Sequence, residues 1–200
     1  MTGQLGAGDP VGSTPLEAED VEGLIPTFVA TRGDLNLVEH ANIEKALVWL
    51  FRGRRVTVDR LLVTAFADRL HRRMLGDVWR WAGARRTRET NIGIDPSGIT
   101  VAMKDLFDDA RHWHANETFS PEERAVRIHH RLVSIHPYRN GNGRHSRLMA
   151  DAYVHVTGTD PLSWGGQDLT DAGELRRSYI KALRDADRGD IGPLLDFARR

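Results

Sequence analysis

The sequence predicts an all-α fold that carries one small β-hairpin. Apolar residues recur at helical spacing through most of the 200 residues. Helix-start signals stand in front of several of these stretches. Only residues 87–101 indicate two short strands around a turn. At roughly 100–200 residues per domain, we expect one domain over residues 14–200, preceded by a flexible, glycine-rich N-terminus over residues 1–13.

The first expected helix is short and spans residues 14–23. Thr14 suits the N-cap position and Pro15 the first helical position, and Gly23 is a typical end signal. Two longer helices are expected over residues 35–50 and 58–75, because apolar side chains recur there every three to four positions.

Four further helices are expected in the second half of the chain. Ser120-Pro121-Glu122-Glu123 forms a capping box and opens one of them, after an amphipathic stretch over residues 104–118. The others begin near Arg144, near Asp171 and after Pro193.

The expected hairpin covers residues 87–101. Residues 91–94 and 99–101 flank Asp95-Pro96-Ser97-Gly98, in which proline at the second position and glycine at the fourth suit a type I turn.

Composition excludes several classes of protein. Because the sequence has no cysteine, it excludes thiol catalysis, Cys–zinc sites and disulfides. Equal numbers of basic and acidic residues, 28 each, argue against a protein that binds nucleic acid over its whole surface. No apolar run is long enough to span a membrane, and the N-terminus lacks the pattern of a secretory signal, so we expect a cytoplasmic protein.

Residues 136–147 are the segment that indicates chemistry. Pro137 biases His136 away from the helical region, and Gly141 and Gly143 allow successive N–H groups to converge at the start of the next helix. Such a helix start favours anions, above all phosphates. Arg144 and Arg147 are three positions apart and share a helix face, where guanidinium groups can bind phosphate oxygens bidentately.

An imidazole beside such a phosphate site can act as a general base. Neutral histidine accepts a proton near pH 7, so His136 could activate a hydroxyl while the arginines and amides stabilise the developing charge. Each feature alone is common, as a capping histidine, a glycine turn or solvated arginines, but their conjunction indicates phosphate binding.

The same segment resembles the signature of the Fic family, His-x-Phe-x-(Asp/Glu)-Gly-Asn-Gly-Arg-x-x-Arg, and residues 70–83 and 176–193 also resemble the family. The subfamily called mobile mystery protein B looks most similar. The resemblance implies a Fic-like helical core and transfer of AMP from ATP to a target hydroxyl, with Mg²⁺. It implies that His136 is the general base, that Gly141, Asn142 and Gly143 hold the α- and β-phosphates, and that Arg144 and Arg147 contact the phosphates, Arg147 at the γ position.

The hairpin matches the flap of that family, which docks the backbone of the target by adding a strand. The resemblance implies this docking role for residues Thr87, Asn91, Ile92, Gly93 and Ile94.

Two motif positions depart from the family pattern. Tyr138 replaces phenylalanine, and we expect its ring to pack and its hydroxyl to reach the rim of the site. Asn140 replaces the acidic metal ligand. Because Mg²⁺ prefers carboxylate oxygens, we expect Asn140 to bind it weakly.

The helix over residues 14–23 is similar to the inhibitory helix of many Fic proteins, (Ser/Thr)-x-x-x-Glu-(Gly/Asn). Glu22-Gly23 matches its end, but Ala18 replaces the expected Ser or Thr, so an ordinary surface glutamate is the alternative. A carboxylate of Glu22 on Arg147 would repel the γ-phosphate, and we expect it to act as a brake. We also expect Arg147 to pair with Asp151, four positions on.

Other interpretations of the same site stay open. They are another donor, such as a different nucleotide, phosphocholine or kinase-like γ-transfer, the reverse removal of AMP, or a weak nucleotide-binding regulatory module. Expected partners are a target protein and a companion protein, as in toxin–antitoxin pairs of bacteria. Self-association is left open, and nucleic-acid contact through Arg52, Arg54 and Arg55 is the minority interpretation.

Overall fold

The computed structural model describes residues 21–52, 56–166 and 173–200. The helices in these ranges are α2 (Arg32–Arg52), α3 (Val58–Leu61), α4 (Thr64–Leu75), the short 3₁₀ helix η1 (Pro96–Gly98), α5 (Ile99–Ala115), α6 (Pro121–Ile135), α7 (Asn142–Thr157), α8 (Glu174–Asp187) and α9 (Gly192–Arg199). The all-α fold class is therefore confirmed. The expected flexible segment 1–13, most of the expected helix 14–23, Arg54, Arg55 and the expected helix start at Asp171 lie outside the described residues.

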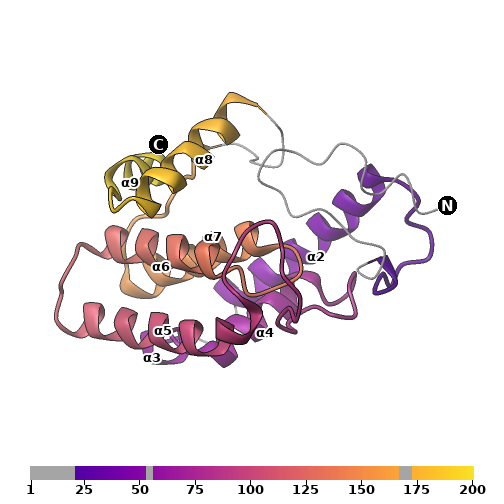
Figure 1. Ribbon diagram of the computed structural model, residues 1–200, viewed down its shortest axis with the longest axis horizontal. Helices are drawn as coiled ribbons and strands as arrows, with labels where there is room; N and C mark the ends of the chain where they lie inside the picture. Colours follow the sequence, from indigo (N-terminus) through magenta and orange to yellow (C-terminus); the bar gives the residue numbers. More distant parts are fainter. Residues whose placement is uncertain (1–20, 53–55, 167–172) are drawn as a thin grey trace.

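Helices α6 and α7 run side by side through the middle of the molecule (Figure 1). Helix α5 packs along α6, α2 packs against α4, and the pair α8–α9 covers the other side. The core between these helices is built from fully buried side chains such as Leu70, Met103, Ile128 and Tyr153. This arrangement places the α6–α7 connection, which holds the motif of residues 136–147, against α4.

Helix α6 forms for the reasons that its sequence indicates. The Ser120 hydroxyl accepts from the Glu123 N–H at 3.2 Å, and Pro121 occupies the first turn. Ala125, Ile128, Leu132 and Ile135 lie on its buried face. The capping box and the apolar spacing therefore predicted this helix correctly.

The expected helix over residues 58–75 is divided into α3 and α4. Leu61 and Leu62 are adjacent and both fully buried. A continuous helix with one apolar stripe does not bury adjacent positions equally well, and the break at Leu62–Val63 lets both side chains enter the core.

The expected β-hairpin over residues 87–101 is not formed. Asp95 instead caps η1, because its side chain accepts from the Ser97 N–H at 2.8 Å with Pro96 in the first turn. Helix α5 then begins at Ile99, which is buried on the same face as Met103. The β-branched residues at positions 99–101 thus belong to a helix, since the apolar period continues through them. The described residues contain no strand, only the isolated bridges Leu24–Trp79 and Arg85–Tyr138.

In the described part of the chain, no helix has both the length and the apolar character needed to cross a membrane.

Candidate functional site

His136 ends α6 and lies almost entirely inside the protein, with 6% of its surface exposed. Its backbone is in the left-handed region, φ 53° and ψ 61°, and it is followed by Pro137. That conformation is uncommon for a residue other than glycine. It turns the chain sharply out of α6, so the imidazole stays beside the loop that leads to α7.

The tautomer of His136 follows from one hydrogen bond. Its Nδ1 lies 3.3 Å from the Val133 carbonyl oxygen, which can only accept, so Nδ1 carries the proton and Nε2 the lone pair of the neutral ring. Burial lowers the pKa of His136 to about 4, against the opposing effect of the Val133 bond, and the charge of Arg86 lowers it further. The ring is therefore a neutral proton acceptor near pH 7.

His71 on α4 holds the motif loop in place. Its Nδ1 accepts from the Gly83 N–H at 2.9 Å, and its Nε2 donates to the Asn140 carbonyl at 3.0 Å. Its ring stacks on Tyr138, with 3.8 Å between the ring centroids. Burial lowers the pKa of His71 to about 4 and so keeps it neutral for both hydrogen bonds.

Asn142 closes the same loop with its side chain. Its Oδ1 accepts from the Tyr138 N–H at 2.9 Å, and its Nδ2 donates to the Tyr138 carbonyl at 2.8 Å. The Asn142 side chain is thus engaged within the protein, and its backbone N–H, in the first turn of α7, has no acceptor within the helix. Gly141 precedes it with φ 77°, a conformation that favours glycine.

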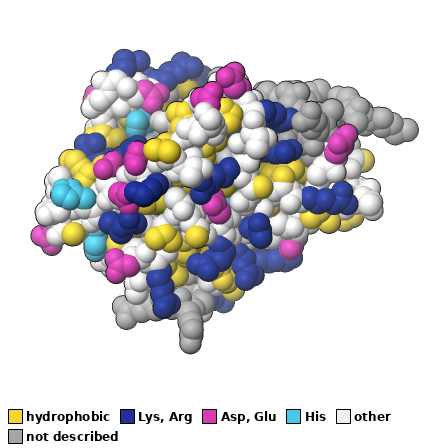
Figure 2. Space-filling view, turned by 60° about the horizontal axis from the view of Figure 1, so that its bottom comes forward, with side chains coloured by type: hydrophobic (Ala, Val, Ile, Leu, Met, Phe, Trp, Pro, Cys, Tyr) yellow, Lys and Arg dark blue, Asp and Glu magenta, His cyan; other side chains and the backbone are white. Residues whose placement is uncertain are grey.

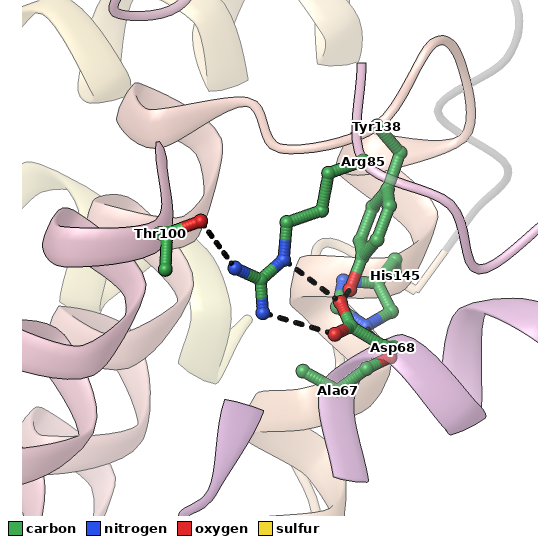
Figure 3. A network of polar contacts seen from close by, with 6 residues as sticks. All are labelled: Ala67, Asp68, Arg85, Thr100, Tyr138 and His145. Carbon is green, nitrogen blue, oxygen red and sulfur yellow. Dashed lines mark hydrogen bonds and ion pairs between the residues drawn. The ribbon is translucent and has the colours of Figure 1, made fainter. Parts of the chain in front are cut away.

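Tyr138 does not reach a rim, which corrects the expectation from the sequence. Its side chain is fully buried, and its hydroxyl donates to Asp68 Oδ1 at 2.9 Å (Figure 3). Arg85 completes the cluster, because its Nη2 lies 3.0 Å from Asp68 Oδ2 and its Nη1 donates to Thr100 at 2.9 Å. The extra hydroxyl, compared with phenylalanine, is therefore paired with a carboxylate on α4.

The start of α7 presents several donors together. The first N–H groups of a helix have no acceptor within the helix, which here applies to Asn142, Gly143 and Arg144. Among the residues that the structure describes, a Cβ built on Gly143 would meet Arg147 Nη1 alone, at 4.0 Å. With respect to these residues, the space beside Gly143 is open toward Arg147, as a phosphate cradle requires.

Arg144 forms an ion pair that the sequence did not indicate. Its Nη1 lies 2.7 Å from Glu39 Oε2, and the Glu39 side chain is 7% exposed. The other oxygen, Oε1, accepts from the Trp79 indole N–H at 2.7 Å. Glu39 therefore orients one motif arginine from the neighbouring helix α2.

Arg147 does not form the expected ion pair with Asp151 in the described structure. Its guanidinium carbon lies 5.7 Å from the centre of the Tyr179 ring. Asp151 Oδ1 accepts from the Trp164 indole N–H at 2.8 Å. Burial raises the pKa of Asp151 to about 6, although the Trp164 hydrogen bond and the charge of Arg147 both lower it.

A cavity of about 800 Å³ lies between α2 and α7. Arg144, Arg147 and Asp151 line it from α7, and Asp34 and His40 line it from the α2 side. The volume is in the range of sites for small molecules and cofactors. Both motif arginines thus border a space in which phosphate groups could lie. Figure 2 shows how widely Lys and Arg side chains are spread over one face of the molecule, so position rather than charge alone singles out these two.

Residues 87–94 form a loop that lies against His136. Ile94 donates its N–H to the Ile135 carbonyl at 3.4 Å. Of the residues expected to dock a target, Thr87, Asn91 and Gly93 are exposed, and Ile92 and Ile94 are half-buried. The loop is therefore close to the proposed base, although it is not a hairpin.

Glu22 is exposed, and its carbonyl oxygen accepts from Arg80 Nη1 at 3.4 Å. The residues next to Glu22 contact the segment after α4. The Gly23 carbonyl accepts from the Arg80 N–H at 2.8 Å, and Leu24 forms an isolated β-bridge with Trp79. Within the described residues, no ion pair joins Glu22 to Arg147.

The residues present do not make a magnesium site on their own. Asn140 Oδ1 is a neutral oxygen, and it accepts from the Gly141 N–H at 2.6 Å. The described ranges contain no group of three or more acidic, histidine or cysteine side chains that could hold a metal. Since Mg²⁺ is usually bound by one or two carboxylates together with substrate phosphates, this donor set does not fit it.

Sequence reasoning missed four residues that build the site: Glu39, Asp68, His71 and Arg86. One signal was available for Glu39, which lies at a core-facing position of α2 between Leu35 and Asn42. The other three act through contacts with residues far along the chain, which residue spacing does not reveal.

The sequence is similar to those of known proteins. Residues 62–154 match the Fic/DOC family. The chain is 30% identical over 139 residues to protein adenylyltransferase fic-1 of Caenorhabditis elegans, a match that covers 66% of this chain and 25% of that protein. It is 30% identical over 191 residues to protein adenylyltransferase Fic of Nematostella vectensis, covering 88% and 41%. The chain thus spans less than half the length of these curated relatives.

Solved structures share the fold. Fic-1 (residues 134–508) from C. elegans superposes with a TM-score of 0.66 at 25% identity, covering 88% of this chain and 50% of that chain. BepC from Bartonella tribocorum, solved with bound AMPPNP, superposes with a TM-score of 0.64 at 16% identity, covering 92% and 97%.

Proposed function

Because the chain belongs to the Fic/DOC family through residues 62–154, we propose that it is a protein adenylyltransferase. It transfers AMP from ATP to a serine, threonine or tyrosine hydroxyl of a target protein. The observation that carries the proposal is the imidazole of His136, whose Nδ1 lies 3.3 Å from the Val133 carbonyl oxygen at the end of α6, in the segment that leads directly to the donor-rich start of α7. The curated relatives named protein adenylyltransferases support the same reaction.

The reaction balances with the groups present. The target hydroxyl attacks the α-phosphorus of ATP and gives its proton to His136 Nε2. The bond between the α-phosphorus and the bridging oxygen breaks, and pyrophosphate leaves. The N–H groups at the start of α7 and the guanidinium groups of Arg144 and Arg147 stabilise the charge on the phosphate oxygens.

The α-phosphate position is favoured over γ-transfer by the intact glycine turn at residues 141–143, which lies between His136 and the arginines in the chain. The open space beside Gly143 supports the same placement of the phosphates. Asn140 would offer a magnesium ion one neutral oxygen, so we expect this position to hold the metal weakly.

Glu22 and residues 87–94 have further roles in the proposed reaction. Glu22 acts as a brake on phosphate binding, and the tie between residues 23–24 and Trp79 supports its location near the site. Residues 87–94 dock the target backbone. A companion protein is a prediction from the motif resemblance, and a bacterial cytoplasmic location stays a prediction from the sequence.

The experiment uses ATP labelled at either the α or the γ position, with the purified chain and a bacterial lysate. We expect label on protein from α-labelled ATP only, and loss of that label in His136→Ala. His112→Ala, an exposed histidine on α5, is the matched control and keeps transfer. Label from γ-labelled ATP would assign a kinase-like reaction instead, and no label from either would contradict the proposal.

A further inference from the structure

Arg86 is a buried cation whose guanidinium group donates to four backbone carbonyls. Its side chain lies in the interior, with the residue 2% exposed. Nε donates to the His136 carbonyl at 2.6 Å, and Nη2 donates to the Ile94 carbonyl at 2.5 Å and to the Ile135 carbonyl at 3.3 Å. Nη1 donates to the Arg88 carbonyl at 3.0 Å. Two acceptors belong to the loop 87–94 and two to the end of α6.

The backbone around Arg86 joins the same two segments. The Arg86 N–H donates to the Pro137 carbonyl at 2.9 Å. Gly93 has φ 113°, and a Cβ built there would lie 2.6 Å from His136 Cβ and 2.6 Å from Arg86 Nη2. The loop therefore touches the histidine without space for an intervening side chain.

The conformation of His136 needs such a restraint. A left-handed backbone is unfavourable for a histidine, and a residue before proline favours extended conformations. The short bond from Arg86 Nε fixes the His136 carbonyl in the direction that this conformation requires.

The positive charge of Arg86 also helps to keep His136 able to accept a proton. The guanidinium N–H groups of Arg86 donate to carbonyl oxygens. Burial lowers the pKa of Arg86, and the negative charges of Asp95 and Glu89 raise it by less. The positive charge of Arg86 lowers the pKa of His136, in addition to the larger effect of burial. An adjacent cation opposes protonation of the imidazole and keeps it a base.

We propose that Arg86 is a positioning residue that holds His136 and the loop 87–94 as one unit, so that the base and the docked target backbone keep a fixed geometry. This inference rests on the proposed adenylyl transfer for its kinetic consequences. The linkage itself concerns the protein alone and can be measured without turnover.

Two variants separate the geometry of Arg86 from its charge. Arg86→Lys keeps the charge but loses the planar fork that reaches four carbonyls, and Arg86→Gln loses both. Arg111→Gln is the matched control, because Arg111 on α5 also donates to a backbone carbonyl, that of Leu62 at 2.5 Å, and this carbonyl belongs to the α3–α4 connection and not to the motif. Folding of each variant is checked by circular dichroism and thermal unfolding.

With α-labelled ATP, we expect both Arg86 variants to lower kcat about 100-fold, since a displacement of about 1 Å at a reacting group has that effect. We expect the acidic limb of the kcat/KM profile to move to higher pH in Arg86→Gln and to stay in place in Arg86→Lys. The Arg111 variant should keep the kcat and the profile of the wild type. Wild-type kcat and an unmoved limb in a folded Arg86→Gln protein would overturn the proposal, as would an equal loss in Arg111→Gln.

Two readouts need no activity. Nuclear magnetic resonance titration should give a higher pKa for His136 in Arg86→Gln, and trypsin should cleave after Arg88 at least about tenfold faster, because the loop has lost its anchor. If the wild type transfers no AMP but both changes occur, the adenylyltransferase proposal fails and the role of Arg86 stands. Unchanged values in the folded variant overturn the role of Arg86 whatever the activity.

Discussion

The carboxylate of Glu39 on α2 lies 2.7 Å from the guanidinium group of Arg144 on α7, and the same carboxylate accepts from Trp79. One motif arginine is thus held by a buried acid from a different helix. A phosphate that binds Arg144 must use the remaining donors of its fork or displace Glu39 from it.

We expect Glu39→Gln to lower the free energy of unfolding by about 2 kcal/mol, because a hydrogen bond to a charged group is worth about that much when one partner is nearly buried. A double-mutant cycle with Arg144→Gln should give a coupling energy of about 1–3 kcal/mol in urea unfolding. The exposed pair Lys45–Asp77, at the same 2.7 Å, should give less than about 1 kcal/mol. Equal coupling in the two pairs would show that Glu39 does not orient Arg144.

The two glycines of the motif should respond oppositely to alanine. Gly143→Ala keeps the helix and should add roughly 0.5–1 kcal/mol of stability, but its methyl group enters the open space near Arg147. We expect the Kd for ATP to rise at least about tenfold, equivalent to ~1.4 kcal/mol, in calorimetry. A Gly143→Ala variant that binds ATP as tightly as the wild type would place the phosphates elsewhere.

Gly141→Ala should instead destabilise the fold, because a Cβ there would lie 2.6 Å from Leu75 Cδ1 at φ 77°. We expect a loss of about 1–3 kcal/mol in urea unfolding. Wild-type stability in this variant would show that the turn before α7 does not depend on glycine.

Buried histidines make the stability depend on pH. The pKa values of His71 and His136 are lowered to about 4 and that of His145 to about 3, mainly by burial. The unfolded chain, with a pKa of about 6.5 for each, therefore binds more protons than the folded chain below that pH. The free energy of unfolding should fall between about pH 6.5 and pH 4, by up to about 1.4 kcal/mol per pH unit for each histidine.

Urea unfolding at several pH values measures this slope. Asp151 acts in the opposite direction, since burial raises its pKa to about 6, but it is one group against four, because burial also lowers the pKa of His129. His145→Gln should reduce the slope, and the exposed His112→Gln should not. A stability that stays level from pH 7 to pH 4.5 would mean that these histidines are not held neutral.

Restoring an acid at position 140 should strengthen metal binding. In Asn140→Asp a carboxylate replaces the neutral oxygen, and Mg²⁺ favours that ligand. We expect the Mg²⁺ concentration for half-maximal AMP transfer to fall about tenfold, with Asn116→Asp at the end of α5 as the control. The same Mg²⁺ requirement in both proteins and in the wild type would show that position 140 does not contact the metal.

Removing the proposed brake should raise activity. Glu22→Gly should increase self-modification with α-labelled ATP at least about fivefold, within the usual range of coupling between sites. Glu44→Ala, an exposed acid on α2, should leave the rate unchanged. Equal rates in the wild type and the Glu22 variant would make Glu22 an ordinary surface residue.

Local signals predicted most of the helices. The capping box at Ser120 and the apolar spacing after it are contained in a few residues, so α6 could be inferred without any tertiary information. The prediction of a hairpin was wrong, and the reason for this error is also local. Asp95 and Pro96 suit a turn and a helix start equally, and the buried position of Ile99 on α5 decided between them.

The residues that hold the motif in place could not be predicted from local sequence signals. Residues 136–147 were sufficient to indicate a base and a phosphate site, since these groups lie in one segment. The partners that hold them are distant in sequence, as Tyr138 is 70 positions from Asp68 and Arg86 is 50 positions from the carbonyl of His136. Only the packing of α4 and the loop 87–94 against the α6–α7 connection brings them together.

Calorimetry of ATP binding alongside AMP transfer, for the wild type and His136→Ala, tests the central claim most directly. If His136 is the base, the variant should lose transfer by a factor of about 10² or more and bind ATP with the Kd of the wild type. A variant that still transfers AMP at the wild-type rate, or that loses ATP binding together with transfer, would contradict the assignment.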